Sequence, residues 1–259
     1  MVFTGSELTS LIGAFLWPLF RIGAMVMSAP VFGARYVPVR VRLVVALAVT
    51  ALVVPLLPPQ PPVELLSPMT LFIIGQQILI GIVMGVALQL VFSAVVTGGQ
   101  IVAMQMGLGF SLMVDPQNGA QAPVLSQFYM LMVLLVFLAL NGHLVMIEVI
   151  VDSFQTMPIG PQGVTADSFW QVVSWASLIF AGGLGMAIPA VASLLVVNFA
   201  FGIMTRSAPQ LNIFAIGFPL TMLIGFALVL LTLPSVIPHS TGMFNDTYHL
   251  IRQLLNGGG

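Results

Sequence analysis

The chain has 259 residues and a formal net charge of −1; 59% of its residues are hydrophobic and 5% are charged. An ordinary soluble domain carries about 25% charged residues, which keep its surface hydrated. Most of this chain therefore faces lipid or the apolar faces of other subunits. The balanced charge gives no basic field for nucleic acid. The absence of cysteine excludes disulfides, thiol nucleophiles and thiolate metal sites.

Apolar runs separated by turn signals predict about six long helices, and a bilayer crossing needs roughly 20 such residues. Proline and glycine inside the runs predict broken, kinked or closely packed helices. In the fifth run we expect the break at Gly182, Gly183, Gly185 and Pro189. The expected fold class is an all-α, multi-pass membrane protein. In chain order, the runs cover residues 11–32, 43–57, 69–96, 124–150, 169–204 and 213–233.

Arg21 lies near the middle of the first run, where an unpaired guanidinium costs about 3 kcal/mol or more. Two interpretations stay open. Arg21 forms a structural ion pair with a residue such as Asp115 or Glu148, or it makes a contact across a subunit interface. In the third run, the GxxxG pattern at Gly81 and Gly85 indicates close helix packing, within the chain or between chains.

The segment that follows the third run, residues 98–119, is apolar but too rich in glycine to be a good helix. Irregular backbone at membrane depth is tolerated only inside protein or along a cavity. Soft methionine and phenyl side chains can close such a cavity against water. The segment is therefore either a hydrophobic channel plug or an ordinary helix hairpin. The candidate plug residues are Met104, Met106, Gly107, Gly109, Phe110, Leu112, Met113 and Asp115.

Glu148 and Asp152 are spaced i, i+4 and share a helix face, as the members of a proton relay would. We prefer the interpretation that the apolar run ends here and that both carboxylates lie at the membrane interface. His143 shows no metal-site spacing, and no catalytic motif or phosphate-binding lysine is present. We therefore expect no enzyme activity, no metal and no cofactor. The tail, residues 244–255, has the pattern of a short interfacial amphipathic helix.

Four stretches distributed along the chain combine polar and apolar residues in specific patterns. They are PVFG from Pro30, QMGLGFS from Gln105, NGHL from Asn141 and RSAPQLNIFAIGFP from Arg206. In these stretches the chain resembles the FliR/SctT family of type III secretion export-gate proteins. The fourth stretch is the most specific, because it is long and mixes both residue classes. The resemblance covers nearly the whole chain.

The resemblance implies one export-gate domain over residues 1–259, built of helical hairpins. It further implies a FliP-like part at about 1–200 and a FliQ-like part at about 201–259. One copy of this chain would assemble with FliP-like and FliQ-like subunits in the inner membrane, at the flagellar basal body. With Arg21, four residues of the fourth stretch are the expected structural or interface residues: Arg206, Pro209, Gln210 and Asn212.

The activity implied by the resemblance is non-enzymatic. The subunit would seal and open a channel for unfolded flagellar substrates and would nucleate the helical assembly, with the candidate plug residues closing the channel. Three alternatives remain. The first is a virulence-type injectisome homologue. The second is a self-contained ion-coupled secondary transporter, suggested by Arg21 and Glu148. The third is an intramembrane protease with Asp115 and Asp152 as its paired carboxylates.

Overall fold

All elements in the described part of this computed structural model are helical. Among the described residues, four helices are long and apolar enough to cross a membrane, or five if one bent pair counts as a single span. This agrees with the all-α membrane fold expected from composition. The chain forms two compact units, and each is described separately. The structure describes residues 5–33, 37–58, 67–109, 124–161, 163–207 and 213–257.

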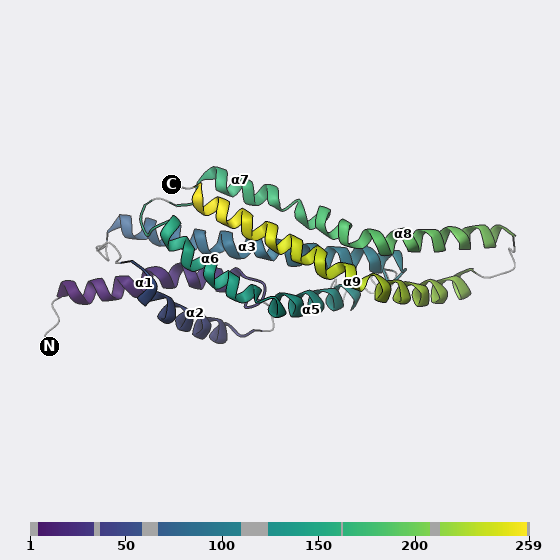
Figure 1. Cartoon of the computed structure of the whole chain (residues 1–259), viewed down its shortest axis with the longest axis horizontal. Coiled ribbons are helices and arrows are strands. Elements are labelled where there is room, and N and C mark those ends of the chain that lie inside the picture. Colours follow the sequence, from purple (N-terminus) through teal and green to yellow (C-terminus); the bar gives the residue numbers. More distant parts are fainter. Residues whose placement is uncertain are drawn as a thin grey trace. The chain divides into compact units, whose positions relative to one another are not determined.

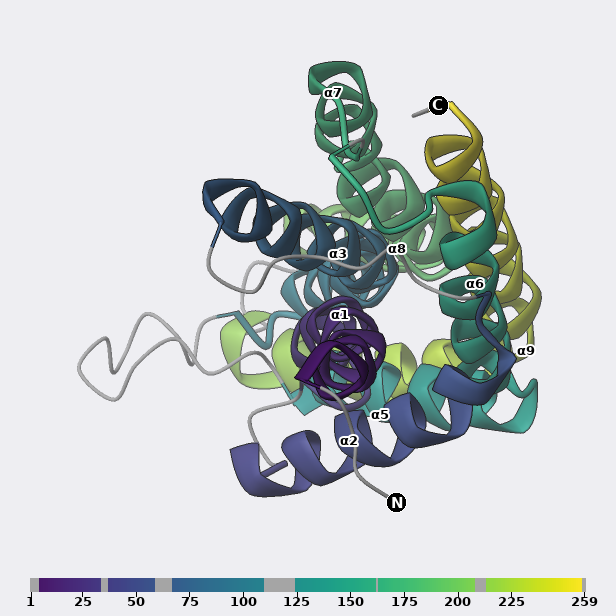
Figure 2. The same cartoon turned by 90° about the vertical axis from the view of Figure 1, so that its left-hand side faces the viewer.

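The first unit comprises residues 1–90, 141–176 and 245–259. It contains α1 (Gly5–Ser28), α2 (Val39–Val53) with the short η1 (Val54–Leu56), and the first part of α3 (Pro68–Gln105). It also contains α6 (Gly142–Thr156), α7 (Ala166–Trp175) and the end of α9 (Ile213–Asn256). Figure 2 shows α2, α3 and α6 arranged around α1, while Figure 1 shows α6 running beside the yellow end of α9.

Helices α1 and α3 approach closely because small residues line their contact. A Cβ atom added at Gly81 would overlap the carbonyl oxygen of Arg21, and one added at Gly85 would overlap the hydroxyl of Ser28. Small residues allow two helix backbones to come this near. The GxxxG pattern therefore serves packing within the chain, which is one of the two roles that the sequence indicated.

The second unit comprises residues 91–140 and 177–244. It contains the remainder of α3, α5 (Val124–Ala139), α8 (Leu178–Ser207) and most of α9. Its core includes three phenyl rings from three helices. The ring centroids lie 5.8 Å apart for Phe92 and Phe137, 5.4 Å apart for Phe92 and Phe244, and 5.1 Å apart for Phe137 and Phe244. Tilted aromatic clusters at these distances add to the free energy that burial provides.

The break expected inside the fifth apolar run lies elsewhere. Helix α8 continues through its glycines and through Pro189, and the interruption falls instead at residues 176–177, between α7 and α8. The glycines serve a different purpose from the one predicted. A Cβ atom at Gly183 would lie 2.8 Å from the carbonyl oxygen of Ala94, so Gly183 permits α8 to pack closely against α3.

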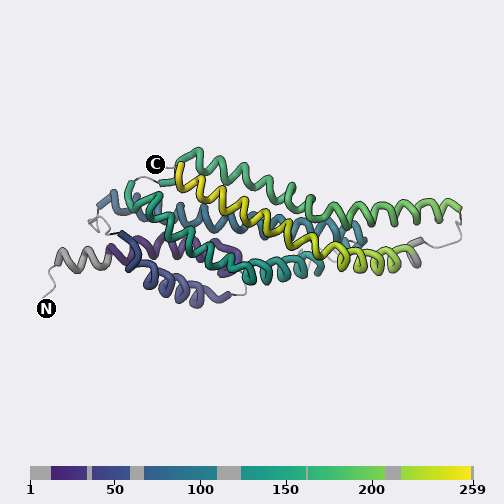
Figure 3. The backbone as a smooth tube through the Cα atoms, viewed as in Figure 1, coloured from purple at the N-terminus to yellow at the C-terminus, as the bar shows by residue number. Residues whose placement is uncertain are grey.

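Helix α9 is continuous over 44 residues despite three internal prolines, Pro219, Pro234 and Pro238, and the tube in Figure 3 follows it to the C-terminal end. Hydroxyl groups near the prolines donate to backbone carbonyls in the same turns, for example Thr232 to Leu228 at 2.9 Å. Serine and threonine side chains in helices commonly make this bond to the carbonyl group three or four residues earlier.

The tail is therefore not a separate interfacial helix, as the sequence had suggested, but the last part of α9. Its apolar stripe is buried inside the protein: Phe244, Tyr248, Ile251 and Leu255 are each less than 10% exposed. The hydroxyl of Tyr248 donates to the carbonyl oxygen of Gly142 at 2.8 Å, at the start of α6. The amphipathic spacing was correctly recognised, but the surface that it covers is protein rather than lipid.

Candidate functional site

Helix α3 continues to Gln105, so residues 98–105 are helical, contrary to the expectation for residues 98–119. The helix then ends in a tight backbone turn within the candidate plug. The amide of Gly107 donates to the carbonyl of Met104 and that of Leu108 donates to the carbonyl of Ala103, both at 3.0 Å. Gly107 has φ of 84°, a left-handed conformation that suits glycine. This hydrogen-bond pattern is the Schellman motif, which stops a helix and redirects the chain. The chain therefore leaves α3 at a defined point.

Two methionines flank this turn in opposite environments. Met106 is completely buried and fills the space left by Gly225 on α9, where an added Cβ would lie 2.7 Å from the Met106 Cγ. Met104 is 63% exposed, and its sulfur lies close to Gly109, 2.7 Å from the position of an added Cβ. The buried methionine anchors the end of α3, while the exposed one leaves most of its side chain uncovered by the rest of the described chain.

The remaining plug candidates, Phe110, Leu112, Met113 and Asp115, lie outside the described residues. The same is true of the interface candidates Pro209, Gln210 and Asn212. Arg206 is described, and it lies exposed in the last turn of α8. A cation there is favourable because the carbonyl end of a helix carries partial negative charge. The assignment of all these residues to a plug or an interface stays a prediction.

Arg21 is fully buried where α1, α3 and α6 meet. Its Nε donates to the side-chain oxygen of Gln77 at 2.8 Å, and one terminal nitrogen donates to the carbonyl oxygen of Ser153 at 2.7 Å and to its hydroxyl at 3.0 Å. The other donates to the carbonyl oxygen of Met157 at 2.8 Å. The guanidinium carbon also lies 4.2 Å from the centroid of the Phe154 ring.

This arrangement stabilises the cation without a carboxylate. The acceptor carbonyls come from the C-terminal end of α6, where the helix dipole is negative, and the aromatic face adds a cation–π interaction. Glu148 is therefore not the ion-pair partner of Arg21 that the sequence suggested, and Asp115 lies outside the described residues. Complete burial within one chain also argues against a contact across a subunit interface.

Glu148 instead forms a salt bridge with Arg252 near the end of α9, with an oxygen–nitrogen distance of 3.3 Å. The side chains of Glu148 and Arg252 are 60% and 46% exposed, so solvent screens the pair. Asp152 and Arg252 line a neighbouring open hollow of ≈ 200 Å³ with Gln155 and Asn256. Glu148 is exposed and Asp152 is half-buried beside an open hollow, so the two carboxylates do not form a buried proton relay.

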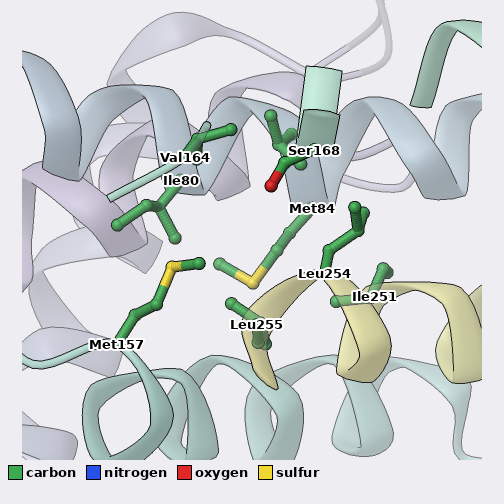
Figure 4. Close-up of a pocket in the computed structure, with 9 residues that line it drawn as sticks. Ile80, Met84, Met157, Val164, Ser168, Ile251, Leu254 and Leu255 are labelled. Atoms are coloured by element: carbon green, nitrogen blue, oxygen red, sulfur yellow. The ribbon is translucent and has the colours of Figure 1, made fainter. Parts of the chain in front are cut away.

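A second cavity, drawn in Figure 4, lies between α3, α7 and the end of α9. Its free space is ≈ 10 Å³, about the smallest volume that holds one water molecule. Figure 4 shows the side chains of Met84 and Met157 pointing toward one another across it, with the hydroxyl of Ser168 at its edge. The small size and apolar lining make this cavity a packing defect rather than a ligand site.

Sequence reasoning identified Arg21 but missed the residues that hold it. Gln77, Ser153 and Phe154 lie 56 to 133 positions further along the chain, and two of the four acceptor atoms are backbone carbonyls. Gln77 lies beside Gln76 among several polar residues of the third run, so its residue type alone did not mark it as a partner of Arg21. Among the described residues, no group of three or more His, Asp or Glu side chains could hold a metal ion.

Comparisons with known proteins give consistent matches. The profile described as "Bacterial export proteins, family 1" matches residues 12–247. The "Flagellar biosynthetic protein FliR" of Escherichia coli (strain K12) is 39% identical over 253 residues, covering 98% of this chain and 97% of that protein. Proteins of the same name from Pectobacterium carotovorum subsp. carotovorum and Bacillus subtilis (strain 168) are 35% and 29% identical, over 98% and 96% of this chain and 97% of each relative.

Proposed function

This chain belongs to the bacterial export proteins, family 1, and on that premise we propose that it is the gate subunit of a flagellar protein-export apparatus. It is a multi-pass inner-membrane protein. The segment from Met104 to Asp115 closes the export channel and yields to unfolded substrates. The chain assembles as one copy with FliP-like and FliQ-like subunits and nucleates their helical arrangement.

The observation that supports this proposal most directly is the anchored end of α3. Buried Met106 and the Gly107 turn fix where the segment begins, and exposed Met104 lies at its root. A seal against ions must exclude water and must also deform when a substrate passes. Methionine and phenylalanine suit both demands, because thioether and phenyl groups are apolar and adapt to irregular surfaces.

The proposal is tested by deleting residues 107–118 and measuring ion leakage through the assembled gate. We expect leakage to rise strongly, because the apolar obstruction is removed while the helices that build the wall remain. Co-purification of the FliP-like and FliQ-like partners verifies that the variant still assembles. A gate that assembles in normal amounts and stays tight would show that the seal lies elsewhere.

A finer test compares two exposed methionines on α3. Met104→Ser changes the root of the proposed plug, whereas Met69→Ser changes the opposite end of the same helix, where Met69 is 50% exposed. Both replacements remove a similar apolar surface. We expect increased leakage only for Met104→Ser. Equal leakage in the two variants would indicate general loosening of the assembly rather than a local seal.

The alternatives receive less support from the described residues. The relatives compared above are flagellar by name, which favours the flagellar role over an injectisome role. The transporter hypothesis relied on Arg21 and Glu148, but Arg21 is held by neutral groups and Glu148 is exposed in an ion pair. The protease hypothesis needs two paired aspartates. Asp152 lines an open hollow, and the other described residues that line this hollow include no second aspartate.

A further inference from the structure

Helix α3 has one open face in the second unit, and most of that face is polar. Among the residues from 91 to 103 that are not buried, two are apolar and three are polar: Ser93, Thr97 and Gln100. At about 100° per residue, these three lie within an arc of about 60° around the helix. Ser93, Thr97 and Gln100 therefore form a polar stripe along α3.

The other sides of this part of α3 are covered by protein. A Cβ atom added at Gly98 would lie 2.8 Å from the carbonyl oxygen of Gly183 on α8, and one added at Gly99 would lie 2.7 Å from the Cα of Ser126 on α5. By the same helical spacing, both glycines lie outside the arc of the polar stripe. The stripe is therefore on the side of α3 that its neighbours in this unit leave partly uncovered.

The open surface of α8 in the same unit has the opposite composition. Between residues 178 and 204, every exposed residue of α8 is Phe, Leu, Ile, Val, Met, Ala, Gly or Pro, with Phe180 and Phe199 among the most exposed. Such a surface suits lipid or the apolar faces of partner subunits. Hydroxyl and amide groups in that environment would lose their hydrogen bonds to water. The polar stripe is therefore suited to water rather than to an apolar environment.

The polar stripe leads to the root of the proposed plug. Met104 lies four residues after Gln100 and falls within the same arc of the helix. Its side chain is 63% exposed, and the turn at Gly107 follows directly. The residues at which the proposed plug begins thus continue the open face of α3.

The polar stripe is also free of charge. No Asp, Glu, Lys or Arg occurs between Glu64 and Asp115. Hydroxyl and amide groups both donate and accept hydrogen bonds, so they can take the place of water around a peptide group. A fixed charge in a confined space of low dielectric constant would hold side chains of the opposite sign and repel the others. A neutral polar surface treats acidic and basic segments alike.

We propose that the polar stripe of α3 forms part of the water-facing wall of the export channel beside the plug, and that its neutrality lets unfolded polypeptides pass whatever the sign of their charge. This inference rests on the proposed function, because it takes Met104 as the root of the plug. It adds the residues that contact water and the passing chain, and it makes their lack of charge the reason that acidic and basic segments are both accepted.

The first test uses the absence of cysteine in the chain. Gln100→Cys and Leu195→Cys variants of the full chain, in the native complex in nanodiscs, are treated with a polar maleimide, and the label on this chain is followed over time. Leu195 on the apolar surface of α8 is 54% exposed and is the matched control. Because a thiol reacts as its thiolate, which requires water, Gln100→Cys should react at least about tenfold faster. Equal rates would overturn the proposal, because the stripe would then be no more hydrated than the apolar surface.

The second test adds charge to the polar stripe. In the gate that lacks residues 107–118, Gln100→Glu should raise the permeability of cations relative to anions, and Gln100→Lys should lower it, each by about threefold, because charges on a channel wall select ions of the opposite sign. Ser207→Glu and Ser207→Lys, at the exposed end of α8, are the matched controls and should leave this ratio unchanged. An unchanged ratio for both Gln100 variants, or an equal change for the Ser207 variants, would overturn the proposal.

The two tests separate the polar stripe from the plug. A gate that leaks after the deletion but shows no change in ion selectivity would overturn the stripe and leave the plug intact. A gate that stays tight after the deletion would contradict the plug. Faster labelling of Gln100→Cys than of Leu195→Cys would then still support a hydrated stripe, and an equal rate would overturn it. Co-purification of the FliP-like and FliQ-like partners verifies that each variant assembles.

Discussion

In the unit formed by residues 1–90, 141–176 and 245–259, three helices meet on one buried guanidinium. In the unit formed by residues 91–140 and 177–244, helices meet on glycines and on three phenyl rings. The first arrangement depends on direction, because every acceptor must lie along an N–H bond of Arg21. The second depends on size, because a single methyl group prevents the close approach of the helices.

The difference shows two ways to specify helix packing when much of the surface is apolar. Dispersion contacts between aliphatic side chains are compatible with many helix arrangements. Hydrogen bonds and close contacts at small residues are each compatible with only a few arrangements. The two units should therefore respond to opposite changes. The first should be sensitive to the chemistry of one side chain and the second to the addition of volume.

Replacing Arg21 with Met should have the largest effect on stability. It leaves the oxygens of Gln77, Ser153 and Met157 without their donor inside the protein, and we expect a loss of about 3 kcal/mol in the free energy of unfolding. Denaturant titration of the chain in mild detergent measures this loss. The stability of the Arg21→Lys variant should lie between those of Arg21→Met and the native protein, because an ammonium group keeps the charge but cannot reproduce the planar set of guanidinium N–H donors.

Arg40→Met serves as the control, because Arg40 is exposed. Its replacement should change stability by less than about 0.5 kcal/mol, as is usual at surface positions. Comparable losses for the Arg21 and Arg40 variants would contradict the claim that the buried hydrogen bonds hold the first unit together.

Adding volume at Gly99 should have the next largest effect. Its added Cβ would lie 2.7 Å from the Cα of Ser126 on α5, a backbone atom that cannot move aside by itself. We expect Gly99→Ala to cost about 2 kcal/mol, as for overpacked cores. Gly75→Ala on the same helix meets nothing within 4 Å and should be neutral or stabilising by up to about 1 kcal/mol. Equal thermal unfolding midpoints for the two variants would contradict the claim that added volume at the contact between α3 and α5 destabilises the protein.

Gly225→Ala should have a smaller effect, because the added Cβ meets the flexible side chain of Met106. Ala favours the helix by about 1 kcal/mol over Gly, which offsets part of the clash. A double-mutant cycle with Met106→Ala should therefore give a coupling of about 1 kcal/mol, since the clash disappears when Met106 is shortened. Gly242→Ala, with open space around its Cβ, should show no coupling to Met106.

Breaking the exposed pair of Arg252 and Glu148 should have the smallest effect. Surface ion pairs contribute from about zero to 1 kcal/mol and are screened by salt. We expect Arg252→Gln to lower the free energy of unfolding by less than about 0.5 kcal/mol and the difference to vanish at high salt. A larger, salt-independent loss would mean that this pair stabilises the first unit in the way that Arg21 does.

The first three predicted runs each coincide with one helix, whereas the fourth run is divided between α5 and α6, and the break expected in the fifth lies elsewhere. Gly183 and Pro189 predicted a break because both residues destabilise an isolated helix. In the folded chain α8 packs against α3, and the close packing that Gly183 allows outweighs the local preference. The same residue type marks a true helix end at Gly107, where φ is positive.

Arg21 shows a second limit of sequence reasoning. Its cost in an apolar helix predicted a partner, and a carboxylate was the natural candidate. The structure supplies carbonyl oxygens at the end of α6, groups that every residue carries and that therefore leave no mark in the sequence. Their availability depends on where α6 ends, and its position against α1 depends on the packing of the whole unit.

The sequence by itself determined three properties: the apolar environment of this protein, the approximate positions of its apolar helices, and its family. Each of these follows from residue types or from their order along the chain. Tertiary structure decided which glycines separate helices and which join them, what satisfies the buried guanidinium, and that the apolar stripe at the end of α9 is covered by protein. These outcomes depend on distances between segments as much as 136 residues apart. Local preference does not encode such distances, because they arise only when the helices pack.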